Sequence, residues 1–470
     1  MRKIFDCIVI GGGVVGCSIF NKLVRIGKKT VLLDSASDVA TGATKANSGL
    51  IHAGYDPEPN TLKAKLNVRG NHLFPSICVR LGVDIKKTGA LVVGDDQEKI
   101  NNLYSRGITN GVEHMHILSR KELIKKVPHL QQGITVGLFA EDAYVVSPYL
   151  YTIALAEEGI INGGEIYLEQ DIVKCEKVNN IFIITTKNET FKAKNIINSA
   201  GAGYNEISKI LGSEKKKIEF RRGEYFVFEK DYNLNVPCTV FPLPTKKGKG
   251  VLVTPTIDGD YLVGPTSEES DNSTVVTKSG LDSIREKSSL ILDNINFKKA
   301  IREFSGIRTI CGNDFVIENS KKQPGVVNIC GICSPGLSSA PAIAEYVIKL
   351  MNFKDKEKDC LSIEPYKFLR DLSQKEQNKL IKSDPDYGKI VCKCEKVTVG
   401  DIKAVLNRPL KVKSVDGIKR RTNAGMGLCQ GGFCFTRVVE LIAESNGIEY
   451  KNVLKENRGS NVAISNIREK

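Results

Sequence analysis

The feature that most constrains this chain is a glycine-rich turn near its N-terminus. An apolar strand at residues 8–10 leads directly into Gly11-Gly12-Gly13-Val14-Val15-Gly16. Gly11 permits a tight turn, Gly13 lets a pyrophosphate approach the backbone, and Gly16 lets the following helix pack closely against the strand. The sequence therefore predicts a β-turn-α unit that binds a nucleotide cofactor.

The residues after this turn complete the pattern in the required order. A helix is expected over residues 14–26, and the free N–H groups at its N-terminus would face the phosphates. A second strand at residues 29–33 ends at Asp34, which can accept hydrogen bonds from the adenosine ribose. We therefore expect the cofactor to contact Val14, Val15, Asp34 and Ser35.

The choice between NAD and FAD depends on a second segment, because an acidic residue at the ribose suits both. The strand at residues 195–199 ends in Ala200-Gly201-Ala202-Gly203, which lets the backbone pass close to a bound nucleotide. With the N-terminal turn, this segment resembles the glutathione-reductase-type FAD proteins of the D-amino-acid oxidase and glycerol-3-phosphate dehydrogenase superfamily, over roughly residues 4–350. The resemblance implies bound FAD, with Ala200 and Gly201 beside it.

A small, polar and glycine-rich loop at residues 41–54 is typical of chain that lies against an isoalloxazine ring. It is similar to the loop of flavoenzymes that oxidise glycerol 3-phosphate or L-2-hydroxyglutarate. That resemblance places His52 at the substrate, where a histidine can take the hydroxyl proton of a secondary alcohol. The alternatives are that His52 only orders the loop or contacts FAD, or that a histidine carries FAD covalently. The loop residues expected at the flavin are Thr44, Asn47, Ser48 and Gly49.

Two basic residues are candidate ligands of an anionic substrate. Arg308 occupies the position of the family's substrate-anchoring arginine by the same resemblance, and a guanidinium binds phosphate or carboxylate in a bidentate manner. We assign Arg308, with His52, to catalysis and to substrate binding. Lys249 is a second candidate phosphate or carboxylate ligand. The alternatives are a structural ion pair for Arg308 and a solvent-exposed turn for Lys249.

The segment at residues 331–341 introduces a helix that is expected to run to about Met351. Its first N–H groups, at Gly336, Leu337 and Ser338, would stabilise negative charge on the reduced flavin. The Cys330-x-x-Cys333 pair just before this helix is interpreted as packing, because no second pair of cysteines lies beside it.

Four cysteines near the C-terminus predict a second cofactor. Cys392 and Cys394 form C-x-C, Cys429 and Cys434 form C-x4-C, and 34 residues separate the pairs. Four thiolates hold Zn²⁺ or a [2Fe–2S] cluster, and C-x-C is uncommon for structural zinc. The segment resembles the bacterioferritin-associated ferredoxin-like domain of anaerobic glycerol-3-phosphate dehydrogenase subunits. We predict a [2Fe–2S] cluster, with zinc as the alternative.

The expected fold class is α/β, with α+β character overall. A Rossmann-like FAD-binding domain of the glutathione-reductase type would carry an antiparallel-sheet substrate domain and a small, mainly helical C-terminal Fe–S domain. Residues 218–265 alternate as strands, and residues 278–300 have a helical pattern. The predicted domains are residues 1–80, 145–215 and 300–352 for FAD, residues 81–144 and 216–299 for substrate, and residues 385–470 for the cluster.

Composition limits the partners and the compartment. The formal charge of +14 comes from scattered Lys and Arg, and no nucleic-acid-binding module accompanies it, so we exclude nucleic acid and expect a small anionic substrate. Thirteen cysteines with no recognisable export signal indicate reduced thiols and a cytoplasmic protein. No apolar run is long enough to cross a membrane, which leaves at most peripheral association through a partner.

These features favour an FAD-dependent dehydrogenase that converts sn-glycerol 3-phosphate to dihydroxyacetone phosphate. Hydride would pass to flavin N5, and single electrons would leave through the cluster to a partner subunit, a carrier protein or a quinone. An L-2-hydroxyacid dehydrogenase or oxidase is the first alternative, and amine or imino-acid oxidation is the next. An electron-relay subunit of a larger flavoenzyme complex is an alternative of another class.

Overall fold

The computed structural model describes residues 3–230, 232–244, 250–354 and 356–463. Its N-terminal part is built on an eight-stranded sheet with the order β10-β11-β12-β1-β2-β9, in which β20 pairs with β12 and β19 pairs with β20. The strands β9, β2, β1, β12 and β20 run parallel, as a dinucleotide-binding sheet requires. The bounds are β1 Ile4–Ile10, β2 Thr30–Leu33, β9 Glu165–Tyr167, β10 Ile172–Val178, β11 Ile181–Thr186, β12 Thr190–Asn198, β19 Val316–Asn319 and β20 Val326–Cys330.

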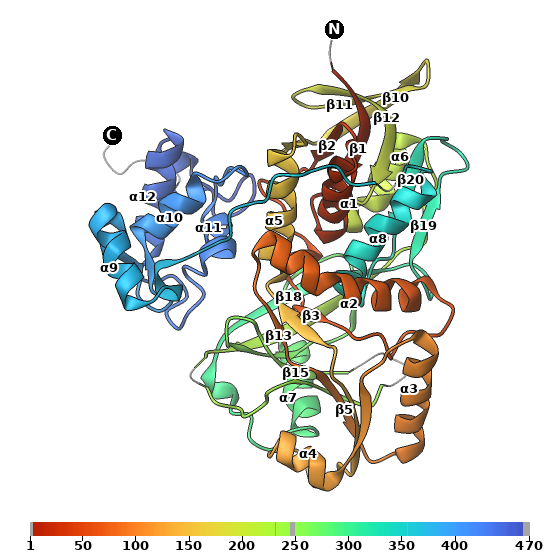
Figure 1. Cartoon of the computed structure of the whole chain (residues 1–470), viewed down its shortest axis with the longest axis vertical. Helices are drawn as coiled ribbons and strands as arrows, with labels where there is room; N and C mark the ends of the chain where they lie inside the picture. The colour runs from red at the N-terminus through yellow and green to blue at the C-terminus, as the bar shows by residue number, and fades with distance from the viewer. Residues whose placement is uncertain (1–2, 231, 245–249, 355, 464–470) are drawn as a thin grey trace.

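Helices pack on this sheet and on one another (Figure 1). Helix α1 contacts both α5 and α8, and α2 packs across α8, so the largest apolar core lies between these helices and the sheet. No helix in the described part of the chain is long and apolar enough to cross a membrane. The bounds of the helices before the C-terminal unit are α1 Val14–Arg25, α2 Leu62–Leu81, α3 Gln97–Asn110, α4 Arg120–Lys126, α5 Pro148–Ile161, α6 Tyr204–Leu211, α7 Lys278–Ser289 and α8 Gly336–Leu350.

A second, nine-stranded sheet forms the layer expected to hold the substrate. Its order is β17-β13-β16-β15-β14-β5-β7-β6, with β18 paired to β13. The pairs are antiparallel, as predicted, except that β14 runs parallel to β5. A small sheet of β3, β8 and β4 stands beside it. The bounds are β3 Leu50–Ile51, β4 Ile85–Lys87, β5 Ala90–Gly94, β6 Met115–Ser119, β7 Val136–Ala140, β8 Tyr144–Val146, β13 Glu219–Phe228, β14 Thr239–Pro242, β15 Leu252–Pro255, β16 Tyr261–Gly264, β17 Glu268–Ser270 and β18 Ala300–Ile310.

The helix predicted over residues 278–300 is only partly present. Helix α7 ends at Ser289, and a short 3-10 helix at Phe297–Lys299 precedes β18. The chain leaves the helix because the Ile291 carbonyl accepts a hydrogen bond from the Gln131 N–H, and Ile291 is buried in the core of the second sheet. A tertiary contact therefore overrides the local helical pattern.

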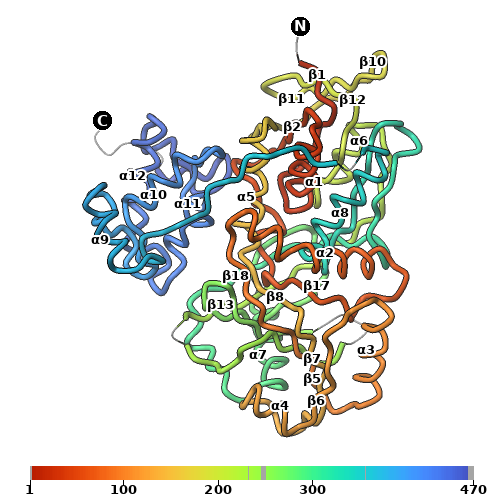
Figure 2. The backbone as a smooth tube through the Cα atoms, in the orientation of Figure 1, coloured from red at the N-terminus to blue at the C-terminus, as the bar shows by residue number. Residues whose placement is uncertain are grey.

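The C-terminal unit has an apolar core of its own, which includes residues from Phe368 to Val453. Figure 2 traces the linker that leaves α8, passes α1 and α5, and enters this unit. Its backbone is held there, since the Lys358 N–H donates to the Arg25 carbonyl and the Leu361 N–H donates to Asn162 Oδ1. The bounds are α9 Gln374–Ser383, β21 Ile390–Cys392, β22 Val397–Thr398, α10 Val399–Leu406, α11 Val415–Thr422 and α12 Phe435–Asn446.

A buried group of charges joins the C-terminal unit to the nucleotide-binding sheet. Asp38, in the loop after β2, accepts hydrogen bonds from Arg421 Nη1 and Nη2 at 2.7 and 2.9 Å and from Arg420 Nη2 at 2.9 Å. All three side chains are almost fully buried. Burial alone would raise the pKa of Asp38, but the guanidinium groups of Arg421 and Arg420 lower it to about 2. The charged carboxylate therefore ties the loop after β2 to α11.

Replacing Asp38 with asparagine should destabilise this junction. The neutral amide cannot compensate the two buried guanidinium groups, so the variant should lose about 3 kcal/mol of stability. Urea unfolding followed by far-ultraviolet circular dichroism measures the loss. Asp282→Asn is the matched control, because Asp282 pairs with Arg285 on the surface and such pairs contribute little. Equal stability of the two variants would contradict the role of Asp38.

The same carboxylate should give the wild-type protein a pH dependence. Its folded-state pKa of about 2 lies below the ordinary value of 3.8. The stabilisation is therefore complete above about pH 4 and is lost as the pH falls toward 2. Thermal unfolding across this range should show a step that Asp38→Asn removes; an unchanged profile in the variant would place the acid sensitivity elsewhere.

Candidate active site and metal centre

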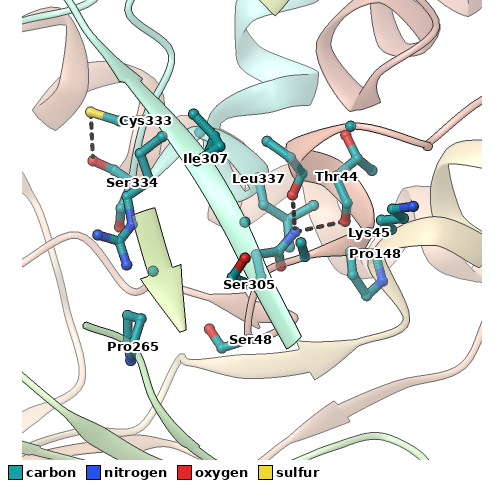
Figure 3. Close-up of a pocket in the computed structure, with 18 of the residues that line it drawn as sticks. Thr44, Lys45, Ser48, Pro148, Pro265, Ser305, Ile307, Cys333, Ser334 and Leu337 are labelled. Carbon is teal, nitrogen blue, oxygen red and sulfur yellow. Dashed lines mark hydrogen bonds between the residues drawn. The ribbon is translucent and has the colours of Figure 1, made fainter. Parts of the chain in front are cut away.

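A continuous cleft of about 2860 Å³ lies between the two sheets. Its wall includes the glycine-rich turn after β1, the loop at residues 41–49, the end of β12 and the start of α8. Figure 3 shows Thr44 and Ser48 of this loop, Ser305 of β18 and Leu337 of α8 around this space. Most of the predicted cofactor contacts line it: Gly11, Gly13, Val14, Val15, Asp34, Ser35, Thr44, Asn47, Ser48, Gly49, Ala200, Gly201, Gly336, Leu337 and Ser338.

The glycine-rich turn has the close contacts that its spacing predicts. A Cβ atom on Gly16 would lie 1.9 Å from the Gly11 carbonyl oxygen, so Gly16 packs behind the wall of the cleft rather than lining it. Gly11 has φ +106°, and a Cβ there would lie 2.5 Å from the Ser199 carbonyl oxygen. At the helix start, the Val14 N–H donates to Thr44 Oγ1 at 3.0 Å. The loop that carries Thr44 is therefore fixed against the N-terminus of α1.

Asp34 lies at the end of β2, where the ribose is expected. Its carboxylate accepts hydrogen bonds from the Gly12 and Ala36 N–H groups, the latter at 2.7 Å. Burial raises the pKa of Asp34, although these two hydrogen bonds oppose the shift. The backbone thus fixes the carboxylate in orientation and leaves it at the wall of the cleft, where a ribose hydroxyl can donate to it.

The loop at residues 41–49 is ordered by its own side chain. Asn47 Nδ2 donates to the Thr44 carbonyl at 2.7 Å, and its Oδ1 accepts from the Gly49 N–H at 2.8 Å. Gly49 has φ +68°, and a Cβ there would collide with the Val146 carbonyl at 2.4 Å. Asn47 therefore shapes the loop, and Ser48 stands at the cleft surface.

The backbone N–H and the backbone carbonyl of His52 both form hydrogen bonds that hold the residue at the cleft. Its N–H donates to Ser338 Oγ at 2.7 Å, at the start of α8, and its carbonyl accepts from Asn67 Nδ2 at 2.7 Å. The ring lies with Nε2 3.4 Å from Ser334 Oγ and with its centre 5.9 Å from that of Phe241. Ser338 was predicted as a cofactor contact, and its hydroxyl also fixes the histidine.

Arg308 reaches the same cleft from β18. Its Nη2 donates to the Thr266 carbonyl at 3.0 Å. Tyr225, on the neighbouring strand β13, hydrogen-bonds both Arg308 and Ser48, and burial raises the pKa of its phenol. The sequence predicts Tyr225 only as a strand residue. The alternating pattern of a strand does not show that its hydroxyl connects Arg308 to the loop at residues 41–49, which is called the flavin loop below. Lys249 lies outside the described residues.

The Cys330-x-x-Cys333 pair does not bond internally in the described structure. The Cys330 thiol hydrogen-bonds Cys311, and burial raises its pKa to about 12. Cys333 Sγ instead lies 3.7 Å from the Ser334 carbonyl (Figure 3). A buried, protonated thiol at the end of β20 agrees with the packing interpretation.

The four C-terminal cysteines form two pairs of thiols. Cys394 Sγ and Cys429 Sγ lie 3.7 Å apart, and the Cys434 thiol hydrogen-bonds Cys392. Among the described residues, no group of three or more His, Cys, Asp or Glu side chains is arranged to hold one metal ion. Because each iron of a [2Fe–2S] cluster takes two thiolates, two pairs of thiols match its donor set.

Within each pair, one thiol has a lowered pKa, Cys392 or Cys429, and the pKa of its partner, Cys434 or Cys394, is raised. A hydrogen bond from Cys434 lowers the pKa of Cys392 to about 6, despite burial. Burial would raise the pKa of Cys429, but N–H groups from residues 431–433 outweigh it and lower the value. The chain turns back on itself at Gln430 and Gly431, which have positive φ, and this turn brings the N–H groups to Cys429. Thiolates are the form that binds iron.

The family described as "FAD dependent oxidoreductase" matches residues 6–350. The chain belongs to this family of FAD-dependent oxidoreductases, which confirms the fold class and the FAD cofactor predicted from the sequence. The family described as "BFD-like [2Fe-2S] binding domain" matches residues 390–444, a segment that contains all four cysteines. The second part is therefore a [2Fe–2S] domain, also as predicted.

Similar proteins cover different shares of the chain. A protein named glycerol 3-phosphate dehydrogenase from Caloramator mitchellensis is 39% identical over 468 residues, which is 97% of each chain. The FAD-bound L-α-glycerophosphate oxidase from Mycoplasma pneumoniae has a TM-score of 0.72 and 31% identity, over 76% of this chain and 97% of its own. An L-2-hydroxyglutarate dehydrogenase from Escherichia coli is 30% identical over 56% of this chain and 64% of its own.

Replacing Cys394 or Cys434 with serine should abolish cluster binding. The wild type is expected to contain about two iron ions and two acid-labile sulfides per chain, and each variant close to none. Iron and sulfide analysis with a visible spectrum measures this. Cys360→Ser is the control, since Cys360 lies in the linker outside the [2Fe–2S] match. A variant that keeps the full iron content would remove its cysteine from the ligand set.

Proposed function

We propose that the chain is a glycerol-3-phosphate dehydrogenase that delivers electrons through its [2Fe–2S] domain. The observation that carries this proposal is the match to the Caloramator protein, which spans both the FAD-binding part and the C-terminal part of the chain. The Mycoplasma oxidase, by contrast, matches only 76% of this chain. The added [2Fe–2S] domain supports transfer to an electron carrier over release to oxygen.

In this proposal, His52 takes the proton of the substrate hydroxyl. The bound FAD supplies the acceptor for the hydride that leaves the same carbon, so the alcohol becomes a ketone with the loss of two electrons and two protons. A base has to be held within hydrogen-bond reach of the hydroxyl. The contacts of His52 to Ser338 and Asn67 support this role, because they fix its backbone at the cleft.

Arg308 binds the phosphate of the substrate. Its Nη2 donates a hydrogen bond to the Thr266 carbonyl, and this contact fixes the orientation of the guanidinium group. The Tyr225 hydroxyl connects the arginine to Ser48 of the flavin loop, so the anion site and the flavin site share one hydrogen-bond chain. Lys249, outside the described residues, remains a proposed second phosphate ligand.

Electrons leave through an exposed face of the [2Fe–2S] domain. Cys394 is exposed. Leu428 and Phe433, each of which directly precedes another ligand cysteine, expose 64% and 80% of their surface. Apolar side chains exposed together are typical of docking sites. A carrier protein, a partner subunit or a quinone would receive the electrons here, and a partner could attach the protein to a membrane.

In this proposal, three parts of the chain have different functions. Residues 1–80, 145–215 and 300–352 bind FAD, residues 81–144 and 216–299 enclose the substrate, and residues 385–470 carry the cluster. Separate apolar cores under the second sheet and in the C-terminal unit support this division. All thirteen cysteines are free thiols, which supports a reducing, cytoplasmic setting.

Oxidation of an L-2-hydroxy acid is the second candidate. The similarity to L-2-hydroxyglutarate dehydrogenase favours it, and Arg308 can bind a carboxylate as well as a phosphate. Anaerobic turnover with a dye acceptor compares sn-glycerol 3-phosphate with L-2-hydroxyglutarate. The proposal expects a kcat/KM at least about tenfold higher for glycerol 3-phosphate. The reverse preference would establish the second candidate, and flavin reduction only by a partner protein would establish an electron-relay subunit.

Variants of the two candidate residues should fail in different ways. Arg308→Ala should raise KM for glycerol 3-phosphate roughly 10- to 100-fold, because a charge-assisted contact to phosphate is lost. His52→Gln should lower kcat about 100-fold or more while KM changes little. Arg437→Ala, a surface variant in α12, is the control. Both variants must keep the wild-type flavin spectrum; wild-type kinetics in either would remove that residue from the site.

A further inference from the structure

The [2Fe–2S] domain supplies part of the wall of the FAD cleft. Lys419 and Arg420 of α11 line it, as do Met426 and Gln430 from the cysteine-bearing loop and Glu456 beyond α12. The contacts across this boundary are specific: the Tyr149 hydroxyl donates to Met426 Sδ at 3.6 Å, and Arg302 Nη1 donates to Gln430 Oε1 at 2.9 Å. The cofactor site is therefore completed by a domain that follows it in sequence.

Most charges at this boundary are neutralised within the protein. Arg420 donates to Asp38 and also to Glu456 Oε1 at 2.8 Å. Lys45, in the loop beside the N-terminus of α1, pairs with the same Glu456. These contacts, with that of Arg421 to Asp38, neutralise Lys45, Arg420 and Arg421, and they hold the loop of Lys45 against the C-terminal domain.

Lys419 differs from its neighbours. Within the residues that the structure describes, no carboxylate is in ion-pair contact with its amine, and Asp416, one turn earlier on α11, pairs with Lys455 instead. Burial and the nearby charge of Arg302 lower the pKa of Lys419 to about 8. An amine in this position gains most from an anion that enters the cleft.

We propose that Lys419 is an FAD-binding residue whose ammonium group contacts a phosphate of the cofactor. The pyrophosphate is the anionic part of FAD, and the glycine-rich turn directs it to the N-terminus of α1. Thr44 is hydrogen-bonded to that N-terminus, and the next residue, Lys45, shares Glu456 with Arg420, which directly follows Lys419 on α11. The turn that receives the pyrophosphate and Lys419 thus lie on the side of the cleft where the loop of Lys45 contacts the C-terminal domain.

This assignment links cofactor binding to docking of the [2Fe–2S] domain. A ligand that contacts two parts of a protein stabilises their assembly by the free energy of those contacts. Bound FAD would hold α11 against the loop after β2, and the docked domain would in turn slow the release of FAD. Bound FAD would therefore favour the docked position of the [2Fe–2S] domain.

The test is the affinity of the full-length protein for FAD, measured without substrate by the change in FAD fluorescence on binding to the apoflavoprotein. Lys419→Met and Lys419→Gln should raise the dissociation constant at least about tenfold. Lys419→Arg, which keeps the charge, should recover most of the affinity. Lys411→Met, an exposed lysine in the same domain, should bind like the wild type. Iron content and circular dichroism verify folding of each variant.

Phosphorus NMR of bound FAD locates the contact. The proposal expects the pyrophosphate resonances of the wild type to move in Lys419→Gln and to return toward their positions in Lys419→Arg. Wild-type affinity in both neutral variants would overturn the proposal, as would weakened binding with unchanged phosphorus resonances. Because no substrate is used, this outcome is independent of which alcohol the enzyme oxidises.

Discussion

The arrangement of both redox centres depends on the buried contact between Asp38 and the two arginines of α11. Removing three charges from water is costly, and the cost is offset only when the geometry is good and the groups are fully paired. Here Arg421 forms a two-point contact with the carboxylate, and Arg420 adds a third hydrogen bond. Three hydrogen bonds converge on one carboxylate, so the contact fixes the orientation of α11 as well as its position, although the Nε atoms of both arginines are buried without a partner among the described residues.

This contact connects the loop after β2, near the expected ribose site, to the segment that leads to two of the cluster ligands. Asp38 lies four residues after Asp34, which is expected at the ribose, and α11 leads into the loop that carries Cys429 and Cys434. The contact therefore fixes the loop after β2 and α11 relative to each other. A second pair with little exposure, Glu157 with Arg408, joins α5 to the segment after α10 and gives the domain a second point of attachment.

Sequence reasoning found what is encoded in short segments. The glycine-rich turn, Asp34 and the four cysteines each follow from steric or ligand requirements that act within a few residues, and the structure places the described ones at the cleft or in two thiol pairs. The sequence does not predict contacts between residues that lie far apart in the chain. Tyr225 carries no motif, α7 ends early because Ile291 bonds to Gln131, and nothing in the neighbourhood of Lys419 shows that α11 faces the FAD cleft.

In the proposed function, one chain takes electrons from an alcohol at the flavin and passes them to its own cluster. Rapid anaerobic mixing of the holoenzyme with sn-glycerol 3-phosphate, without any acceptor, tests it most directly. The flavin absorption should bleach first, and the electron paramagnetic resonance signal of the reduced [2Fe–2S] cluster should follow. A bleached flavin beside a cluster that stays oxidised, although dithionite reduces it, would contradict transfer within the chain.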